Sequence, residues 1–413
     1  MDRITRLPIK YSLIFLVLTE VLVWIGPVDY TIKRPLVLIL YLGILNYALY
    51  LGYKRGAKKA RVTSCVLSSQ TFYFIIILGL ICTIYTMYVK WGARGYSITW
   101  NHLSNSIINP GQAYVRDEKV VFNVSVLYVI LSPFQWVAIP FGIYYWKRLN
   151  ELFKIIVIIT FVITIATWLG IGTRKGLLDL LIITSFLIFA RTPSILNNEH
   201  AVRRIKIVGC LLIGLFLYYF VVSNLSRDGL GISEISQYER VEYKKWYADH
   251  LPTPIVVSLS DITSYLSGGY HLLSLGLDEG IIPPTFLGMS LSTANYANRF
   301  WGYDPLPGTY MQLIQDKYGY DKFEYWHTFY LWLANDFTFI LVPFIVFLIG
   351  FYFARVWIDA VNGQNPFAYP VFAYILVMVF YFFANNQVIS FNLESFIGCI
   401  LLYCLSKSNS KKK

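Results

Sequence analysis

Charged side chains are scarce in this 413-residue chain, because Asp, Glu, Lys and Arg together make up only 14% of it. An ordinary soluble domain carries about 25% charged residues. This chain therefore has too few charged side chains to cover the surface of a water-soluble protein of its size. Cysteine is scarce as well, and the 5 residues present give no CxxC spacing and no disulfide framework. Because neither an HExxH pattern nor a glycine-rich phosphate loop occurs, the sequence predicts no metal site and no cofactor.

Apolar and aromatic residues are abundant instead. Hydrophobic residues make up 56% of the chain, and 33 Tyr, 29 Phe and 11 Trp exclude a disordered protein. Ten apolar stretches approach the roughly 20 residues that a helix needs to cross about 30 Å of hydrocarbon. They are 11–27, 35–53, 69–89, 121–146, 153–171, 176–190, 205–223, 330–354, 368–384 and 389–405. The sequence therefore predicts an all-α polytopic membrane protein with about ten transmembrane helices, with nine or eleven as alternatives.

The distribution of Lys and Arg predicts the orientation of these spans. If the N-terminus is cytoplasmic, the cytoplasmic segments hold more than twice as many Lys and Arg residues as the short outside loops. Both termini then lie in the cytoplasm, and the net charge of +12 reflects topology signals such as 54–61 and 411–413. We therefore expect no nucleic-acid partner.

The first span follows a basic start, as a signal peptide does. Its outer end, Trp24-Ile25-Gly26-Pro27, is not a small-residue cleavage site, so the first span is interpreted as a retained anchor.

One outside segment is much longer than the others and divides the chain into three parts. Residues 1–223 carry the first seven spans, 224–328 form the large loop, and 329–413 carry the last three spans and the tail. Within the loop, Pro254 to Leu277 has apolar residues at helical spacing and an interruption at Gly268-Gly269. This predicts a helix that lies either in the outer membrane interface or in the core of a small extramembrane subdomain.

The first candidate site joins the fifth and sixth spans and reads Thr173-Arg174-Lys175-Gly176. Arg174 and Lys175 would lie at the outer membrane surface, where the next helix begins. A helix N-terminus offers free N–H groups, and a guanidinium can bind a phosphate through two hydrogen bonds. Arg227, beside an acid just outside the seventh span, is a second candidate for a phosphate contact. The alternatives are cations that lie among lipid head groups and a solvated Arg–Asp pair.

A third group of candidates surrounds the start of the eighth span. Asp336 has apolar neighbours on both sides, and a carboxylate inside a membrane is costly unless it is paired or protonated. It is a candidate general base or a partner for an arginine, and a structural ion pair is the alternative. His327 is a second candidate base. Tyr265, Tyr270 and Trp301 are candidates for stacking on sugar rings, although the same residue types form interfacial belts.

The layout of the chain resembles the Wzy-type O-antigen or capsular repeat-unit polymerases. The resemblance covers essentially the whole chain: about ten spans, cytoplasmic termini, an Arg-Gly turn between middle spans, and one large periplasmic loop before the last three. Two stretches, Tyr265-Leu266-Ser267-Gly268-Gly269-Tyr270-His271-Leu272-Leu273-Ser274-Leu275 and Ala334-Asn335-Asp336-Phe337, are similar to stretches of the oligosaccharide repeat unit polymerase group.

This resemblance implies a glycosyltransferase C-like fold in the bacterial cytoplasmic (inner) membrane. Such enzymes transfer a growing chain from undecaprenyl diphosphate to an incoming lipid-linked repeat unit at the periplasmic face, without a nucleotide sugar, metal or other cofactor. Periplasmic arginines hold the donor diphosphate, a role carried over to Arg174 and, less directly, to Arg227. Related ligases show Ser-Arg-Gly at the first turn, whereas Lys175 is inserted between the arginine and the glycine here. The resemblance therefore leaves open the geometry of the contact between Arg174 and the phosphate.

The expected partners are undecaprenyl-diphosphate-linked oligosaccharide, membrane lipids and a chain-length regulator.

Other functions are compatible with the same layout. An O-antigen ligase would move the finished polysaccharide to lipid A core or another acceptor. A flippase or transporter of lipid-linked oligosaccharide would have shorter loops and internal repeats, and a sensory protein would carry a cytoplasmic signalling domain. The sugar composition and the linkage are not encoded in any recognisable motif.

Overall fold

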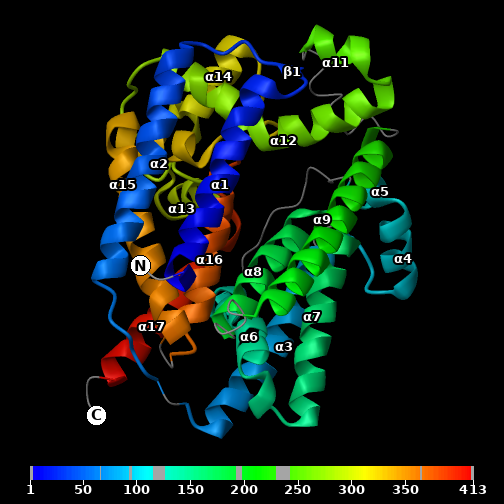
Figure 1. The fold of residues 1–413 in the computed structure, drawn as a ribbon, viewed down its shortest axis with the longest axis vertical. Coiled ribbons are helices and arrows are strands. Elements are labelled where there is room, and N and C mark those ends of the chain that lie inside the picture. Colours follow the sequence, from blue (N-terminus) through cyan, green and yellow to red (C-terminus); the bar gives the residue numbers. More distant parts are fainter. Residues whose placement is uncertain are drawn as a thin grey trace. The chain divides into compact units, whose positions relative to one another are not determined.

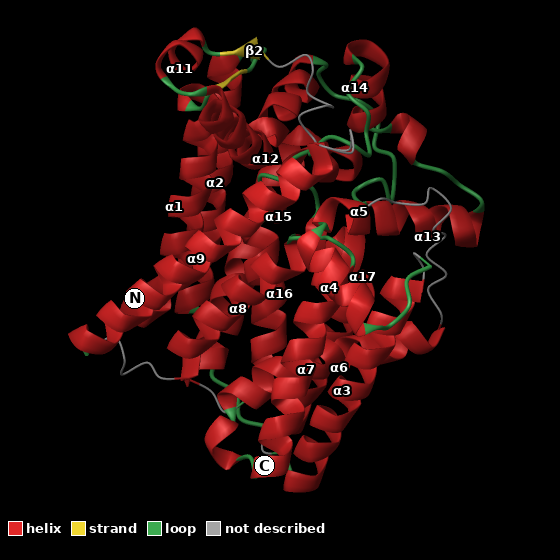
Figure 2. Ribbon diagram, turned by 90° about the vertical axis from the view of Figure 1, so that its right-hand side faces the viewer, coloured by secondary structure: helices red, strands yellow, loops and turns green. Residues whose placement is uncertain are grey.

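The computed structural model describes residues 3–65, 67–92, 95–114, 126–191, 198–228, 242–362 and 365–410. Helices dominate this part of the chain (Figure 2), and its strands β1 (Val28–Asp29) and β2 (Glu242–Tyr243) form one short antiparallel ribbon. The first helices are α1 (Arg3–Ile25), α2 (Pro35–Lys58), α3 (Ser69–Gly92), α4 (Trp100–Ile108), α5 (Pro110–Tyr114), α6 (Val126–Tyr144), α7 (Glu151–Gly170), α8 (Lys175–Arg191) and α9 (Glu199–Asp228). They are followed by α11 (Lys245–His250), α12 (Thr253–Asp278), α13 (Leu291–Trp301), α14 (Tyr310–Tyr318), α15 (Phe329–Asn362), α16 (Ala368–Phe380) and α17 (Gln387–Ser410).

Helices α1, α2, α3, α7, α9, α15 and α17 are long and apolar enough to cross a membrane. Many of their large apolar side chains, such as Leu36, Leu215 and Ile340, are exposed. In water such surfaces would be unfavourable, whereas in lipid they are solvated. The chain is therefore a multi-pass membrane protein. The other three predicted spans coincide with α6, α8 and α16 where the structure describes them. These helices do not combine the length and the hydropathy that the other seven have.

The chain forms two compact units, and each is assembled from separate stretches of sequence. Unit 1 contains residues 1–60, 237–355 and 374–393, and unit 2 contains 61–236, 356–373 and 394–413. Three of the five boundaries between the two units fall inside α15, α16 and α17. The compact units therefore do not follow the chain order of the predicted segments 1–223, 224–328 and 329–413.

In unit 1, α2 approaches α15 closely through two glycines. A Cβ atom at Gly52 would overlap with the carbonyl of Phe347, and one at Gly56 would overlap with the carbonyl of Phe351. Small residues four apart let two membrane helices approach each other at the level of the backbone. Helices α1 and α2 contact each other, and both contact α12 (Figure 1).

Helix α12 contains the half-apolar stretch of the large loop and continues without a break from Thr253 to Asp278. The predicted interruption at Gly268-Gly269 is therefore wrong. Gly269 serves close packing instead, since a Cβ there would overlap with the carbonyl of Phe383 and press on Thr328. Helix α12 contacts α1, α2 and α14.

In unit 2, α3 packs mainly against α6 and α7, while α8 contacts α6, α7 and α9. The core at one end of α3 contains the buried residues Ile76, Leu149 and Val157. At Gly79 the backbone of α3 lies so close to α6 that a Cβ would overlap with that of Ala138. These contacts place the α7–α8 turn, which carries the first candidate site, on a packed helical base.

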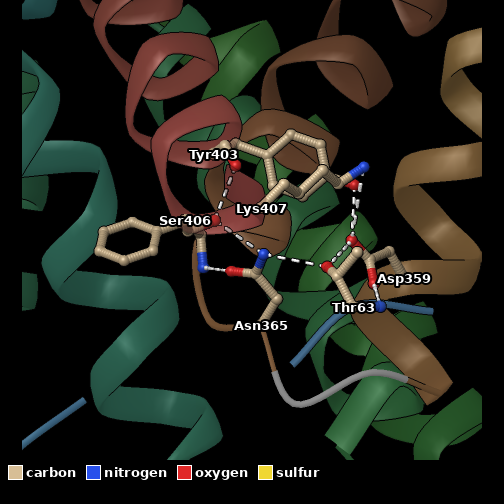
Figure 3. A network of polar contacts seen from close by, with 7 residues as sticks. Thr63, Asp359, Asn365, Tyr403, Ser406 and Lys407 are labelled. Atoms are coloured by element: carbon tan, nitrogen blue, oxygen red, sulfur yellow. Dashed lines mark hydrogen bonds and ion pairs between the residues drawn. The ribbon is translucent and has the colours of Figure 1, made fainter. Parts of the chain in front are cut away.

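A buried polar network in unit 2 is centred on Asp359 of α15, whose side chain is fully inaccessible (Figure 3). Its Oδ1 accepts a hydrogen bond from the backbone N–H of Thr63, at 2.6 Å, and its Oδ2 accepts bonds from the hydroxyls of Thr63 and Tyr403, at 2.7 and 2.6 Å. Lys407 Nζ lies 3.8 Å from Oδ2. The carboxylate thus joins the segment after α2, the end of α15 and the end of α17.

Candidate functional site

The α7–α8 turn positions Arg174 and Lys175 as the sequence predicts. Helix α7 ends at Gly170 and α8 begins at Lys175, so only four residues connect them. Gly172 has a φ of 62°, a value that favours glycine, and allows the chain to reverse direction at this point. The carbonyl of Arg174 accepts the first hydrogen bond of α8, from the N–H of Leu178, at 3.2 Å.

Arg174 is held in place by α9. Its side chain is 6% exposed, its guanidinium carbon lies 4.1 Å from the ring centre of Phe220, and Nη1 donates to the Phe220 carbonyl at 3.3 Å. A guanidinium over an aromatic face is favourable by about 0.5–2 kcal/mol. Arg174 is therefore a buried cation with a fixed position at a helix N-terminus, rather than a solvated side chain at the membrane surface.

Lys175 lies one turn before an acid that the sequence interpretation overlooked. Its Nζ contacts Asp179 Oδ2 at 2.6 Å, and the Asp179 side chain is only 1% exposed. The i,i+4 spacing of Lys175 and Asp179 is a sequence signal that could have identified the pair. Asp179 Oδ1 and the hydroxyls of Thr173 and Ser223 are buried without a hydrogen-bond partner in the described part of the chain. These three polar atoms belong to the α7–α8 turn, α8 and α9, the elements that surround Arg174.

Two further residues surround this turn and were not singled out from the sequence. Lys90 Nζ, at the end of α3, lies 3.6 Å from the ring centre of Trp168 on α7. Trp168 also packs against Gly176, where a Cβ would overlap with the indole. His102 on α4 contacts the Gly170 carbonyl through Nε2 at 2.8 Å. Lys90, Arg174 and Lys175 therefore place three cations around one helix turn of unit 2.

Arg227 lies in the last turn of α9, which runs from Glu199 to Asp228. The helix therefore continues beyond the predicted seventh span, through the polar Ser-Asn-Leu-Ser sequence. The side chain of Arg227 lies outside the described residues. Its backbone follows Phe220, the residue that contacts Arg174, by seven positions, which corresponds to about two turns or roughly 10 Å along the helix.

Asp336, the candidate base of unit 1, fixes a distant loop. Its Oδ1 accepts hydrogen bonds from Thr285 Oγ1 at 3.0 Å and from the Gly288 N–H at 2.9 Å, and Oδ2 accepts one from the Met289 N–H at 3.2 Å. Phe286 and Leu287 in this loop have positive φ angles of 48° and 67°. A carboxylate bonded in this way stabilises an unfavourable loop conformation, and no described arginine is paired with it.

Two backbone carbonyls near Asp336 are released from the helical hydrogen bonds of α15, one by a break at Thr338 and one by Pro343. Thr338 has a non-helical conformation with a φ of 55° and a ψ of 159°. The Asn335 carbonyl accepts a hydrogen bond from the Thr285 N–H at 2.8 Å. Because Pro343 has no N–H, the Phe339 carbonyl is also released from the helix, and it accepts a bond from Tyr41 Oη at 3.0 Å. Both carbonyls are therefore satisfied in a setting where unpaired ones are costly.

His327, the second candidate base, is completely buried just before α15. Its N–H donates to Asn385 Oδ1 at 2.9 Å, and its carbonyl accepts from the Asn385 N–H. The same Asn385 Oδ1 accepts a bond from Trp332 Nε1 at 3.0 Å, and Asn385 has a φ of 40°. Burial lowers the pKa of His327 to about 4 because the charged form is disfavoured there, so the imidazole is neutral at neutral pH.

The three candidate sugar-stacking residues have very different surroundings. Tyr265 lies edge-on to Trp326, with 5.1 Å between ring centres. Tyr270 is fully buried and shares a hydrogen bond of 3.0 Å with Thr19 Oγ1, which favours a structural role. Trp301 is 70% exposed at the end of α13. Of the three, Tyr265 and Trp301 are the ones with accessible ring surface.

The candidate residues separate into two groups. Arg174 and Lys175 belong to unit 2, whereas Asp336, His327 and the three aromatic residues belong to unit 1. Within the described residues, no group of three His, Cys, Asp or Glu side chains could hold a metal ion. No protein-family model matches the sequence, and no curated protein or solved structure matches it. Its function therefore has to be inferred from the two groups themselves.

Proposed function

We propose that this protein is a membrane glycosyltransferase of the repeat-unit polymerase type, with a glycosyltransferase C-like arrangement of about ten spans. It transfers a growing oligosaccharide from undecaprenyl diphosphate onto an incoming lipid-linked repeat unit. The reaction takes place at the periplasmic face of a bacterial inner membrane, and both termini of the chain are cytoplasmic. The products are O-antigen or capsular polysaccharide.

The observation that carries this proposal is the fixed, buried guanidinium of Arg174 at the start of α8. As the glycosidic bond to the diphosphate breaks, negative charge develops on the leaving group. A cation that is already in position stabilises this charge without reorganisation, and loss of one such contact typically lowers kcat by about 10²–10³. Phe220 holds the guanidinium ready before the substrate arrives.

The position of Arg174 in the chain suits a lipid-borne diphosphate. It lies in a four-residue turn between two apolar helices, α7 and α8. A polyprenyl chain in the bilayer would lie along such helices and bring its diphosphate to the end of them. The unpartnered hydroxyls of Thr173 and Ser223 supply additional donors, and Lys90 adds positive charge at the same end of unit 2.

The acceptor hydroxyl must lose a proton during transfer, and of the two candidate bases His327 is the one that does not support the 285–289 loop, although burial makes its imidazole a weak base. Its imidazole is neutral at neutral pH, whereas the Asp336 carboxylate is engaged by three hydrogen bonds from the 285–289 loop. We therefore assign the proton transfer to His327 and the support of the loop to Asp336.

The test is Arg174→Ala at the native locus, followed by gel analysis of the surface glycan. The expected result is loss of the ladder of long chains, while glycan with a single repeat unit persists because its attachment needs no polymerisation. Arg174→Lys should restore only part of the ladder, since an ammonium cannot contact a phosphate through two parallel bonds. Arg204→Ala, at an exposed position near the start of α9, is the matched control.

A normal ladder in Arg174→Ala would contradict the proposal. Loss of the single-repeat glycan together with the ladder would favour a ligase instead. Immunoblots of membrane fractions establish that each variant is present in comparable amounts.

A further inference from the structure

The connection between α16 and α17 and the first turn of α17 contain buried polar side chains that lack partners. Asn386, Gln387 and Ser390 are 0%, 2% and 7% exposed. Asn386 Oδ1, both polar atoms of the Gln387 amide, and Ser390 Oγ have no hydrogen-bond partner among the described residues. A buried polar group without a partner typically costs about 1–3 kcal/mol, so four such atoms in a few residues require an explanation.

The backbone around these side chains is well held. Asn386 Nδ2 donates to the Met289 carbonyl at 3.0 Å, and the Ser390 carbonyl accepts from Ser292 Oγ at 2.8 Å. The Ser390 N–H bonds to the Asn386 carbonyl, also at 2.8 Å, so these two residues lie one turn apart on the same side of α17. The unpartnered atoms therefore have fixed positions and are not the ends of solvated side chains.

Aromatic groups lie close to the same connection. Asn385 forms two backbone-directed hydrogen bonds with His327, whose neighbour Trp326 has a buried indole N–H without a partner in the described chain. Trp326 in turn contacts Tyr265, and Tyr265 also contacts Phe383, with ring centres 6.4 Å apart. An aromatic surface and an unused donor therefore adjoin the Asn386–Ser390 turn.

The chemistry of these groups indicates an uncharged ligand rich in hydroxyls. Two amide oxygens accept, the Gln387 amide and the Trp326 indole donate, and the Ser390 hydroxyl does both. Neither a Lys nor an Arg is among them, which disfavours an anion, and without a carboxylate they do not favour a cation. A sugar hydroxyl both donates and accepts, and its ring can stack on an aromatic side chain.

We propose that Asn386, Gln387, Ser390 and Trp326 form a saccharide-binding subsite in unit 1. The subsite holds the oligosaccharide part of a substrate and is independent of the diphosphate contact at Arg174. Only the identity of that oligosaccharide, a repeat unit of the surface glycan, rests on the proposed function. The ligand supplies the hydrogen bonds that the described residues leave unmade.

The test uses the purified full-length protein in nanodiscs and an oligosaccharide without its lipid diphosphate, released from the host surface glycan by mild acid. Gln387→Met keeps the size of the side chain and removes both polar atoms. We expect the variant to bind the oligosaccharide at least tenfold more weakly in a calorimetric titration, while its melting temperature without ligand stays the same or rises. Gln70→Met, at an exposed position at the start of α3, should change neither quantity.

Unchanged affinity in Gln387→Met, or no binding by the wild-type protein, would overturn the proposal. A lowered melting temperature with unchanged affinity would show that ordered water, rather than sugar, satisfies these atoms. If Gln387→Met does not fold, Ser390→Ala provides the same comparison with a smaller change in volume. Arg174→Ala should retain binding of this lipid-free probe, so failure of the subsite and failure of the diphosphate site give different results.

Discussion

Two regions of this protein bury polar side chains in opposite ways. Around Asp359 in unit 2, both oxygens of the buried carboxylate have hydrogen-bond partners. Two hydroxyls and one backbone N–H donate to them, and the ammonium group of Lys407 lies 3.8 Å away. Around Gln387 in unit 1, fixed amide and hydroxyl groups have no partners among the described residues. The first arrangement is what a structural anchor requires, and the second is what a binding site requires before its ligand arrives.

Asp359→Ala should give the largest effect, because it removes the acceptor of the buried Tyr403 hydroxyl and of the half-buried Thr63 hydroxyl. Breaking a buried network on one side costs about 3–5 kcal/mol. We expect little folded protein by size-exclusion chromatography, and a strongly lowered melting temperature for what remains. Asp249→Ala, on an exposed acid of α11, is the control. If Asp359→Ala had wild-type stability, the network would have no anchoring role.

Asp336→Asn should have the next largest effect. The amide nitrogen of asparagine would replace one of the two carboxylate oxygens and would face either the Gly288 N–H or the Met289 N–H, which then loses its acceptor. An unmade buried hydrogen bond of this kind costs about 2 kcal/mol. We expect a lowered melting temperature and faster proteolysis between residues 281 and 291. Loss of turnover without any change in stability would instead restore Asp336 as a candidate base.

Acidification should destabilise unit 1 through its buried histidines. Burial lowers the pKa of His327 to about 4, below its ordinary value of about 6.5, so the unfolded chain binds more protons between these pH values. Stability is therefore lost as the pH falls below about 6.5, and one such histidine contributes about 1.4 kcal/mol between pH 7.5 and 5.5.

Melting temperatures over this pH range measure the effect. Burial lowers the pKa of His271 to about 4 as well, so His327→Gln should reduce the loss of stability on acidification without abolishing the histidine contribution. The same slope in both proteins would mean that His327 is not responsible for the pH dependence.

Ser406→Ala should give the smallest effect. The Ser406 hydroxyl accepts a hydrogen bond from Asn365 Nδ2 at 2.8 Å at the edge of the Asp359 network. Its loss should cost about 1 kcal/mol, visible as a modest decrease in melting temperature. A decrease as large as that of Asp359→Ala would show that Asn365, rather than the carboxylate, is the centre of the network.

The helices were largely predictable because the membrane requires apolar segments of defined length. Their ends were less so. The apolar sequence after Phe380 hides the end of α16, since the chain leaves the helix to pair Asn385 with His327, 58 residues away. Similarly, the polar residues after Ser223 concealed the continuation of α9 to Asp228.

The candidate sites were also predictable to different degrees, because some depend on neighbouring residues and others on residues far away in the chain. The Arg174 turn is local, because two helices with a short connection leave little freedom, and its flanking glycines mark it. The surroundings of Asp336 depend on residues 285–289, and no sequence pattern links these positions. The unpartnered groups near Gln387 are visible only when the contacts of every buried atom are known.

The break in α15 has a consequence for the way this protein is assembled in the membrane. No glycine or proline occurs in Asn335-Asp336-Phe337-Thr338, so the bent conformation depends on an outside partner for the Asn335 carbonyl. Thr285, which supplies this partner, reaches Asn335 only after its loop has folded. Until then the start of this segment should persist as a straight helix, so bending it would be among the last steps of maturation.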